Sequence, residues 1–236
     1  MLFRSDGAVT CFFGKMDMGQ GVDVAIAQMV AEELDVDFKR VSVVMGDTAF
    51  TCNQGGASGS TAIQFGGIAL RNAAAEARRV LVERAAKQLA VPAERLSVID
   101  GVVSDGTRTL TYGELLGGRY FDVQLDWNKL FGNPLAVKGK AQPKKPADYK
   151  VVGQSFERSD VPGKVYGSRP FSTDIRVPGM LHARMIRPPH AGATISSVDE
   201  ASLRGIAGAR VVREKEFLGV VADTEWDAIQ AAQALK

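Results

Sequence analysis

Hydrophobic and polar positions repeat with two different periods along the chain, and the change of period predicts where helices and strands lie. Apolar residues that recur three, four or seven positions apart form one face of a helix. The helices predicted in this way cover residues 22–35, 60–90, 112–116, 199–203 and 225–234. Short runs rich in β-branched residues and bounded by turn residues predict strands. The predicted strands cover residues 8–15, 40–45, 96–99, 102–104, 174–177, 180–187, 194–198, 209–212 and 217–222.

Two glutamates of the first long helix are expected on solvent-exposed surface. Glu32 and Glu33 lie near the end of the first amphipathic helix, outside its apolar stripe. In the second helix, Glu76 lies largely away from the face that carries Leu70 and Leu81. The pattern therefore predicts that Glu32 and Glu33 are solvated.

A change in composition predicts the boundary between two domains. Residues 131–146 are rich in glycine, proline and lysine, which is typical of a linker. The basic cluster Lys138–Pro146 is expected to be a solvated part of that linker rather than a binding patch. Residues 1–146 then form one domain, and residues 147–236 form a second in which strands outnumber helices. The predicted fold class is α+β.

Two glycine-rich loops each follow a predicted strand and precede a predicted helix. The first glycine loop is Met16-Asp17-Met18-Gly19-Gln20-Gly21, and the second is Asn53-Gln54-Gly55-Gly56-Ala57-Ser58-Gly59-Ser60-Thr61. At a helix start, free N–H groups and the positive end of the helix dipole attract anions, and glycine lets a ligand approach the backbone. Two such loops on one unit predict a site for a ligand with more than one phosphate or a long polar body. For either loop alone, a flexible surface turn is the alternative.

Neither loop carries the fingerprint of a common nucleotide-binding motif. Gly19-x-Gly21 is followed by Val24 where a dinucleotide-binding loop has its third glycine, and neither loop ends in Gly-Lys-Ser/Thr. The side-chain amide of Gln20 both donates and accepts hydrogen bonds, so it could recognise the edge of a ligand's ring through paired hydrogen bonds. Solvation of the turn is the alternative role for this side chain.

The amino-acid composition limits the classes of partner and metal site that are expected for this chain. The chain has 236 residues and a net charge of +2, so there is no bulk reason to expect nucleic acid or a membrane surface. No apolar run reaches membrane-spanning length. Cys11 and Cys52 lack C-x-x-C spacing, so an iron–sulfur cluster on this chain is not expected, and both are predicted to be buried thiols. His182 and His190 cannot form a protein zinc site without help from carboxylates.

The motifs together resemble the molybdenum-cofactor-binding subunit of the xanthine dehydrogenase and aldehyde oxidase family. In the first domain the resemblance rests on Met18-Gly19-Gln20-Gly21-Val22, Gly46-Asp47-Thr48, Gln54-Gly55-Gly56-Ala57-Ser58-Gly59-Ser60 and Leu70-Arg71-Asn72-Ala73-Ala74. Residues 147–236 resemble the α/β hammerhead domain of this family, through residues 161–167, 174–175, 178–183, 187–191, 219–224, 226 and 228. Because cofactor-type sequence precedes the hammerhead, the order is similar to that in the branch of the isoquinoline 1-oxidoreductase β-chains.

The resemblance implies a cofactor and the residues that would hold it. The cofactor would be a molybdopterin with molybdenum, in bacteria usually the cytosine dinucleotide form, with no FAD or iron–sulfur cluster on this chain. Contacts to its pterin and phosphate part are implied for Gly19, Gln20 and Gly21. The second glycine loop would surround the cofactor with N–H groups and hydroxyls through Gly55, Gly56, Ala57, Ser58, Gly59, Ser60 and Thr61, with Ala57 nearest the metal. Asp47 and Thr48 would brace the loop.

The resemblance also implies an activity and partners. The family hydroxylates an electron-poor carbon of aldehydes or N-heterocycles with oxygen from water, and passes electrons to iron–sulfur centres on another subunit. A glutamate late in the family's sequence acts as general base, and no segment here matches it, so no catalytic residue is expected in this chain. Because Met1 leads almost directly into a strand, we expect a fragment that is inactive by itself. Its expected partners are the iron–sulfur subunit and the rest of its own large subunit, with a second copy as a further candidate.

Two other classes of function remain open from the residues alone. The glycine loops would also suit a nucleotide- or phosphate-binding module without redox chemistry. The exposed faces of an incomplete domain would suit a module that pairs with another subunit. The compartment, bacterial cytoplasm or periplasm, stays open as well.

Overall fold

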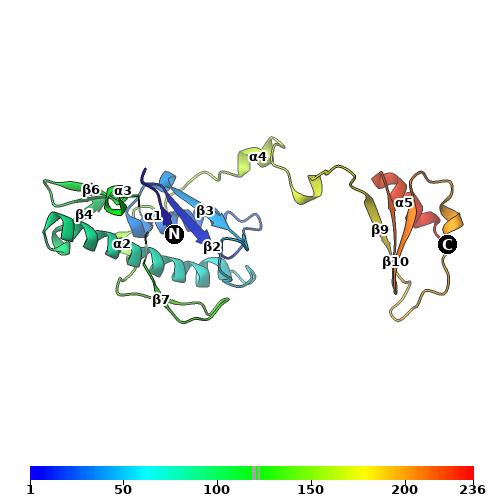
Figure 1. Ribbon diagram of the computed structural model, residues 1–236, viewed down its shortest axis with the longest axis horizontal. Coiled ribbons are helices and arrows are strands. Elements are labelled where there is room, and N and C mark those ends of the chain that lie inside the picture. Colours follow the sequence, from blue (N-terminus) through cyan, green and yellow to red (C-terminus); the bar gives the residue numbers. More distant parts are fainter. Residues whose placement is uncertain (119–120, 122) are drawn as a thin grey trace. The chain divides into compact units, whose positions relative to one another are not determined.

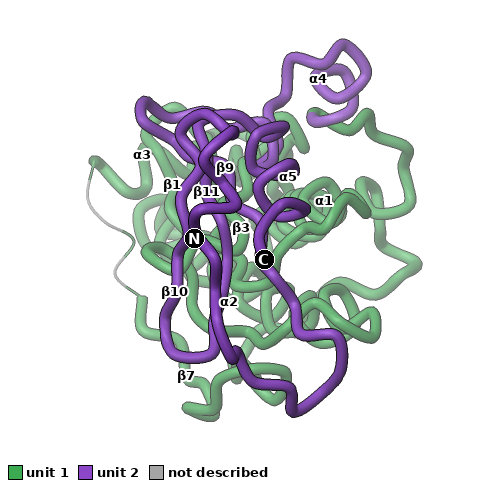
Figure 2. The backbone as a smooth tube through the Cα atoms, turned by 90° about the vertical axis from the view of Figure 1, so that its right-hand side faces the viewer, with its two compact units in different colours: residues 1–159 green, residues 160–236 purple. Residues whose placement is uncertain are grey.

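The computed structural model describes residues 1–118, 121 and 123–236, and the chain divides into two compact units. Met1–Ser159 form the first unit and Asp160–Lys236 the second (Figure 2). The division falls later than the boundary predicted after Pro146, and the cause is a set of buried hydrogen bonds described below. Among the described residues, no helix has both the length and the apolar character needed to cross a membrane.

A small sheet and two helices make the core of the first unit (Figure 1). The sheet has the order β1 (Leu2–Phe3), β2 (Val9–Phe13), β3 (Val41–Met45), and β2 and β3 are parallel. The helix α1 (Val22–Leu34) connects them, because parallel neighbours need a crossover connection. The apolar stripes predicted from the sequence are buried here; the core includes Val9, Phe13, Ile26, Val30, Leu34, Ala74 and Leu81.

The longest predicted helix is present, but its beginning is not α-helical. Residues Ala62–Gly67 form a π-helical segment, which continues directly into α2 (Ile68–Leu89). Ser60, just before it, has the left-handed backbone angle φ 59° that side chains rarely adopt. Short π segments inside helices occur frequently at functional sites, and this one begins where the second glycine loop ends.

Smaller elements complete the first unit. A second sheet has the order β4 (Ser97–Ile99), β5 (Val102–Ser104), β6 (Thr109–Thr111), and the short helix α3 (Tyr112–Leu116) follows it. Thr111 and Glu114 form a capping box at the start of α3. The pair β7 (Asp126–Trp127) and β8 (Val137–Lys138) lies within the stretch that the sequence pattern left unassigned or assigned to a linker. Three-residue 3-10 helices cover Phe38–Arg40, Ala93–Arg95 and Pro146–Asp148.

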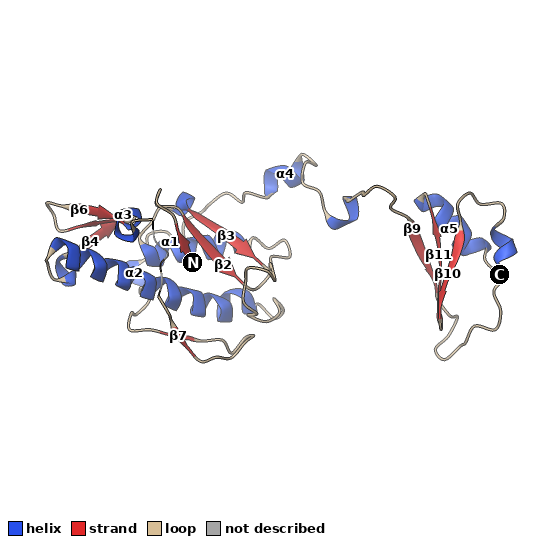
Figure 3. Ribbon diagram, in the orientation of Figure 1, coloured by secondary structure: helices blue, strands red, loops and turns tan. Residues whose placement is uncertain are grey.

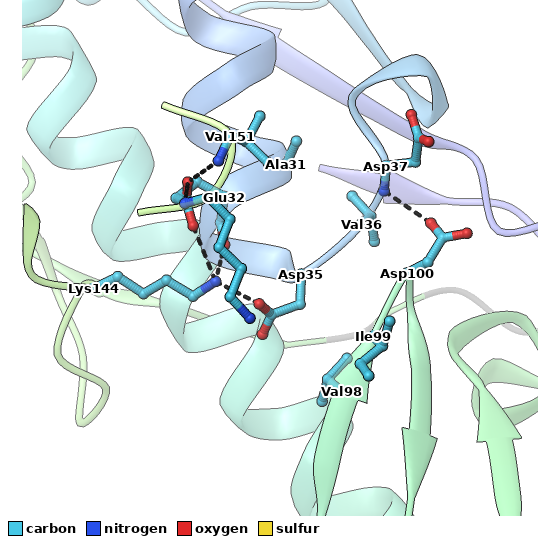
Figure 4. A pocket seen from close by; sticks show the side chains of 11 residues that line it. Ala31, Glu32, Asp35, Val36, Asp37, Val98, Ile99, Asp100, Lys144 and Val151 are labelled. Atoms are coloured by element: carbon cyan, nitrogen blue, oxygen red, sulfur yellow. Dashed lines mark hydrogen bonds and ion pairs between the residues drawn. The ribbon is translucent and has the colours of Figure 1, made fainter. Parts of the chain in front are cut away.

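The segment predicted to be a solvated linker is instead bound to the two long helices. We call residues 137–154 the strap segment. The carboxylate of Glu32 accepts hydrogen bonds from the backbone N–H groups of Lys150, Val151 and Val152 at 2.8, 2.6 and 2.9 Å, so it satisfies three backbone donors of this segment at once (Figure 4). The ammonium of Lys144 contacts both Glu32 and Asp35.

Two further carboxylates hold the strap segment in the same way. Glu33 accepts from the backbone N–H of Lys144 at 3.0 Å and from the guanidinium of Arg71. Glu76 accepts from the N–H groups of Lys140 and Ala141, both at 2.9 Å.

The prediction that Glu32 and Glu33 are solvated is therefore wrong. Glu32 and Glu33 are each 1% exposed and Glu76 is 7% exposed. A buried carboxylate needs partners, and here the partners are backbone N–H groups of a segment far away in the sequence. The same bonds explain why the first unit extends past Pro146.

The second unit is an antiparallel sheet covered by a helix (Figure 3). The sheet order is β10 (Arg210–Glu214), β11 (Phe217–Ala222), β9 (His182–Ile186), and α5 (Glu225–Ala234) packs against β11 and β9. Its small core contains Leu203, Val220 and Ala231. A short helix α4 (Val161–Val165) and 3-10 helices at Ser172–Asp174 and Glu200–Leu203 complete it. The strands predicted at 174–177 and 194–198 are not formed, because neither run pairs with a neighbouring strand among the described residues.

Candidate functional site

The parallel pairing of β2 and β3 brings the two glycine loops to one edge of the sheet. Phe13 and Met45 are partners at the carboxyl ends of the two strands, and the N–H of Gly46 donates to the carbonyl of Phe13 at 3.0 Å. The N–H of Gly14 donates to Oε1 of Gln54 at 2.6 Å, which ties the start of one loop to the other. Ligands of open α/β sheets bind outside the carboxyl ends of strands, and both loops lie there.

A close backbone approach at Gly14 holds the two loops together. A Cβ atom at this position would lie 1.7 Å from the carbonyl oxygen of Cys52, so no residue with a side chain fits. Gly66, inside the π-helical segment, lies similarly close to the ring of Phe13, with 2.7 Å from a Cβ to the nearest ring atom. These two glycines have packing roles rather than roles as turn residues.

Lys15 is the residue at this edge that sequence reasoning missed. It is 1% exposed, and its ammonium donates to the carbonyl of Gly56 at 2.8 Å, to Oδ1 of Asn133 at 2.7 Å and to Oγ1 of Thr61 at 3.3 Å. Burial lowers the pKa of Lys15, and no carboxylate of the described residues forms an ion pair with it. The sequence feature that could have identified Lys15 is its position directly between a predicted strand and a glycine loop.

The second glycine loop presents free backbone donors. Within the part of the chain that the structure describes, the N–H groups of residues 56–60 donate to no protein acceptor. The hydroxyl of Thr61 is already engaged, with the carbonyls of Gly56 and Ser58 at 2.9 and 2.8 Å. Gly55 and Gly59 adopt positive φ values of 83° and 62°. Ser58, Gly59 and Ser60 are exposed, so the loop is accessible to solvent at these residues.

The first glycine loop differs, because an anion of the protein itself occupies it. The carboxylate of Asp17 accepts the N–H of Gly19 at 2.6 Å. Burial raises the pKa of Asp17, but hydrogen bonds from the backbone N–H groups of Gly19, Gly21, Asp23 and Val22 offset this, so the pKa is lowered overall. Oε1 of Gln20 accepts from the N–H of Met18 at 2.7 Å, which leaves the amide NH₂ of Gln20 as its donor group.

Other segments of the first unit touch both loops. The guanidinium of Arg158 donates to the carbonyl of Gly19 at 2.9 Å. Gly132 donates from its N–H to the carbonyl of Asn53 at 2.9 Å, next to the Asn133 side chain that accepts from Lys15. Asp47 closes the turn that leads into the second loop, with Oδ1 accepting from the N–H of Ala49 at 2.8 Å. This is the bracing role expected for Asp47.

Large apolar side chains on and near the two loops are exposed. They are Met16, Met18, Phe50, Ile63, Phe65 and Ile68. Cys52, predicted to be buried, is exposed as well, whereas Cys11 is buried as predicted and burial raises its pKa to about 12. It is the backbone carbonyl of Cys52 that packs against Gly14.

A cavity of about 280 Å³ lies at the other end of α1, lined by Glu32, Asp35 and Lys144 among others (Figure 4). These three charged groups already bind each other or the backbone of the strap segment. Among the described residues, no group of three or more His, Cys, Asp or Glu side chains could hold a metal ion. The edge with the two glycine loops is therefore the better candidate site.

Comparison with known proteins identifies the family of the first unit. Residues 1–158 match the molybdopterin cofactor-binding domain family. The chain belongs to this family. The matched stretch contains both glycine loops, Lys15 and the strap segment.

Two curated relatives cover nearly the whole chain. It is 39% identical over 241 residues to one of the subunits of nicotinate dehydrogenase from Pseudomonas putida, covering 98% of this chain and 19% of that protein. It is 32% identical over 261 residues to the β-chain of isoquinoline 1-oxidoreductase from Brevundimonas diminuta, covering 98% of this chain and 33% of that protein. The chain thus spans a third or less of the length of these relatives.

A solved structure is similar over part of the chain. The CO dehydrogenase of Oligotropha carboxidovorans matches with a TM-score of 0.44 and 25% identity, covering 48% of this chain and 15% of that one.

The donor set of this molybdopterin-binding domain fits an anionic cofactor at the second glycine loop. The free N–H groups of residues 56–60 and the hydroxyls of Ser58 and Ser60 are hydrogen-bond donors of the kind that phosphate oxygens accept. The buried ammonium of Lys15 adds a positive charge behind them. At the first glycine loop, by contrast, Asp17 already uses N–H groups that such a ligand would need.

Proposed function

We propose that this chain is part of the molybdopterin-binding subunit of a molybdenum hydroxylase that oxidises N-heterocycles or aldehydes with water as the source of oxygen. The observation that carries the proposal is the meeting of two glycine loops at the carboxyl ends of β2 and β3, inside a domain of the molybdopterin-binding family. The relatives named nicotinate dehydrogenase and isoquinoline 1-oxidoreductase support the N-heterocycle class, and a relative named membrane-bound aldehyde dehydrogenase supports the aldehyde class.

The proposed cofactor is molybdopterin cytosine dinucleotide. Residues Gly55 to Thr61 would hold its phosphate-bearing part, through free N–H groups and through Ser58 and Ser60. Gly19, Gln20 and Gly21 would contact its pterin side, where the NH₂ group of Gln20 is the available side-chain donor. When bound, the molybdenum centre would supply two-electron oxidation of the substrate carbon. The chain's own contribution is to bind and orient the cofactor.

The remaining parts of the enzyme are proposed to lie on other polypeptide segments. The exposed apolar side chains Met16, Met18, Phe50 and Phe65 support a covered interface at this edge, since contiguous exposed apolar surface marks interaction sites. We propose that the rest of the large subunit covers them, and that an iron–sulfur subunit receives the electrons. The second unit, a sheet of β10, β11 and β9 under α5, is proposed to be the hammerhead domain. This chain alone is proposed to be inactive.

The test uses the full-length protein and one carboxylate placed in the second loop. We expect the purified wild type to contain molybdenum and a pterin whose oxidised form is fluorescent. A Cβ at Gly56 would meet no atom within 4 Å, so Gly56→Asp is tolerated sterically while its charge repels phosphate. The variant should therefore lose most of its molybdenum and pterin.

Gly205→Asp is the matched control, because a Cβ at Gly205 also meets nothing within 4 Å and the position lies in the second unit. It should keep the wild-type cofactor content. A wild type without molybdenum or pterin, or equal cofactor content in both variants, would contradict the proposed function.

A phosphate- or nucleotide-binding module without redox chemistry is the second candidate. The free N–H groups of residues 56–60 favour it, because they are suited to any phosphate group. Tight binding of ordinary nucleotides by the chain, together with a full-length protein that lacks molybdenum, would establish this alternative in place of the first.

A further inference from the structure

We propose that Lys15 and Asp17 have opposite effects on anion binding, so that an anionic group binds at the second glycine loop and not at the first. Lys15 acts as a positioning residue that holds this loop in the conformation in which its backbone N–H groups are free to bind a ligand. Asp17 acts as a built-in anion that excludes a second one from the first glycine loop. The inference rests on the proposed function only in assuming that the ligand carries phosphate.

The geometry of Lys15 supports the positioning role. Its ammonium has three protons, and it has three acceptors within 3.3 Å: the carbonyl of Gly56 and the side chains of Thr61 and Asn133. With its donors used in this way, Lys15 reaches a ligand only through the loop that it holds. It joins both ends of the loop, since Gly56 lies near the start and Thr61 at the end. The N–H groups between these two residues are the ones without a protein acceptor in the described part of the chain.

The charge of Lys15 adds a second effect. All three acceptors are neutral, and no described carboxylate pairs with the ammonium. A buried charge without a counter-ion is costly, so an anion bound in the loop would stabilise the protonated form. By linkage, anion binding raises the pKa of Lys15, and protonated Lys15 binds the anion more tightly.

The first glycine loop carries charge of both signs, because the Arg158 guanidinium donates to the carbonyl of Gly19 while Asp17 supplies a carboxylate within the loop. The carboxylate of Asp17 accepts the N–H of Gly19, and further N–H groups at the start of α1 contribute to lowering the pKa of Asp17. Asp23, in the first turn of α1, adds a buried Oδ1 that has no hydrogen-bond partner among the described atoms. Two carboxylates thus compensate this helix end, and a phosphate there would meet like charge and donors already in use.

The experiment measures binding of inorganic pyrophosphate to the whole 236-residue chain, labelled with ¹⁵N, by NMR. In the wild type we expect amide shifts at residues 56–60 and none beyond background at residues 19–23. The side-chain signal of Lys15 should titrate at a higher pH when pyrophosphate is bound. A purely structural lysine would not show this dependence on the anion. Equal shifts at both loops, no binding at all, or an unchanged Lys15 titration would overturn the proposal.

Variants separate the two roles. Lys15→Met should weaken pyrophosphate binding at least about tenfold, while Lys15→Gln, which keeps two N–H donors, should retain part of the affinity. Asp17→Asn removes the charge but keeps one acceptor oxygen, and should add pyrophosphate-dependent shifts at Gly19 and Gly21. Asp37→Asn is the control, because Asp37 accepts the N–H of Lys39 at 2.7 Å in the same manner, but follows the C-terminal end of α1 instead of preceding its start.

The outcomes distinguish failure of this inference from failure of the proposed function. If Asp17→Asn opens no second site, the inference is wrong whatever the full-length protein contains. If Lys15→Met does not fold, the proposal is still tested by the titration of Lys15 in the wild type and by pyrophosphate binding to the Asp17→Asn variant. Absence of molybdenum from the full-length protein would contradict the proposed function, but it would not affect the conclusion drawn from pyrophosphate binding.

Discussion

The backbone N–H of Val151 lies 2.6 Å from Oε2 of Glu32, although the two residues are 119 positions apart. Glu32 accepts two more N–H groups of the strap segment and is 1% exposed. The bond therefore joins the end of the first unit to the helix that follows the first glycine loop. It makes the strap segment part of the cofactor-binding domain rather than a linker between domains.

Removing the Glu32 carboxylate should destabilise the first unit. Glu32→Ala leaves three buried backbone donors and the Lys144 ammonium without this partner, which costs about 3–5 kcal/mol by analogy with broken buried ion pairs. Urea unfolding followed by circular dichroism measures the change. The exposed Glu94 is the matched control, and Glu94→Ala should change the free energy of unfolding by less than about 0.5 kcal/mol. Equal effects of the two variants would refute the role of Glu32.

Stability should fall as the solution becomes acidic. Burial raises the pKa of Glu32, but N–H bonds from the strap segment and the charge of Lys144 lower it by more. The pKa of Glu76 is lowered chiefly by its hydrogen bond with Arg79. A carboxylate whose folded pKa is depressed adds stability above the unfolded value of 4.5. That stability is lost as the pH falls from this value through the folded pKa.

The measurement is the free energy of unfolding between neutral pH and about pH 3. We expect it to decrease below about pH 4.5 in the wild type. In the Glu32→Gln, Glu76→Gln double variant, the decrease over the same range should be smaller, because two of the titrating groups are gone. An unchanged slope would show that other carboxylates control the acid transition.

The contact between Gly14 and Cys52 should tolerate no side chain. A Cβ at Gly14 would lie 1.7 Å from the carbonyl oxygen of Cys52, and both atoms belong to backbone-anchored groups that cannot move aside cheaply. Gly14→Ala should therefore cost at least about 2 kcal/mol and lower anion binding at the second loop. Gly205→Ala, with nothing within 4 Å, is the control and should be close to neutral in urea unfolding. A folded Gly14→Ala variant of wild-type stability would contradict the close approach.

The two cysteines should react at very different rates. Cys52 is exposed, whereas Cys11 is buried, and burial raises the pKa of Cys11 to about 12. Since the thiolate is the reactive form, a thiol reagent at about pH 8 should modify Cys52 quickly and Cys11 only after denaturation. Labelling of Cys52→Ser provides the check, because the native variant should show no fast reaction. Rapid modification of that variant would mean that Cys11 is accessible.

The local pattern of apolar and polar residues was sufficient to predict much of the fold. The periodicity predicted α1, the body of α2, α3, α5 and the strands β2 to β5 and β9 to β11 within a few residues, because these elements bury one regular face. It also located the two glycine loops, because each glycine-rich stretch lies between a strand pattern and a helix pattern. The strands predicted at 174–177 and 194–198 failed because a β-like run becomes a strand only when a partner edge is available.

The sequence by itself determined most of the elements, the order of the two units and the composition of both loops. The tertiary structure alone decided which charges are buried. The period of a helix tells which face is polar, but it does not tell what covers that face, and the strap segment covers Glu32 and Glu33. Lys15 was undecided for the same reason, since its acceptors on Gly56, Thr61 and Asn133 come within hydrogen-bond distance only in the folded chain. Burial and partnership are properties of contacts between distant segments, and those contacts exist only after folding.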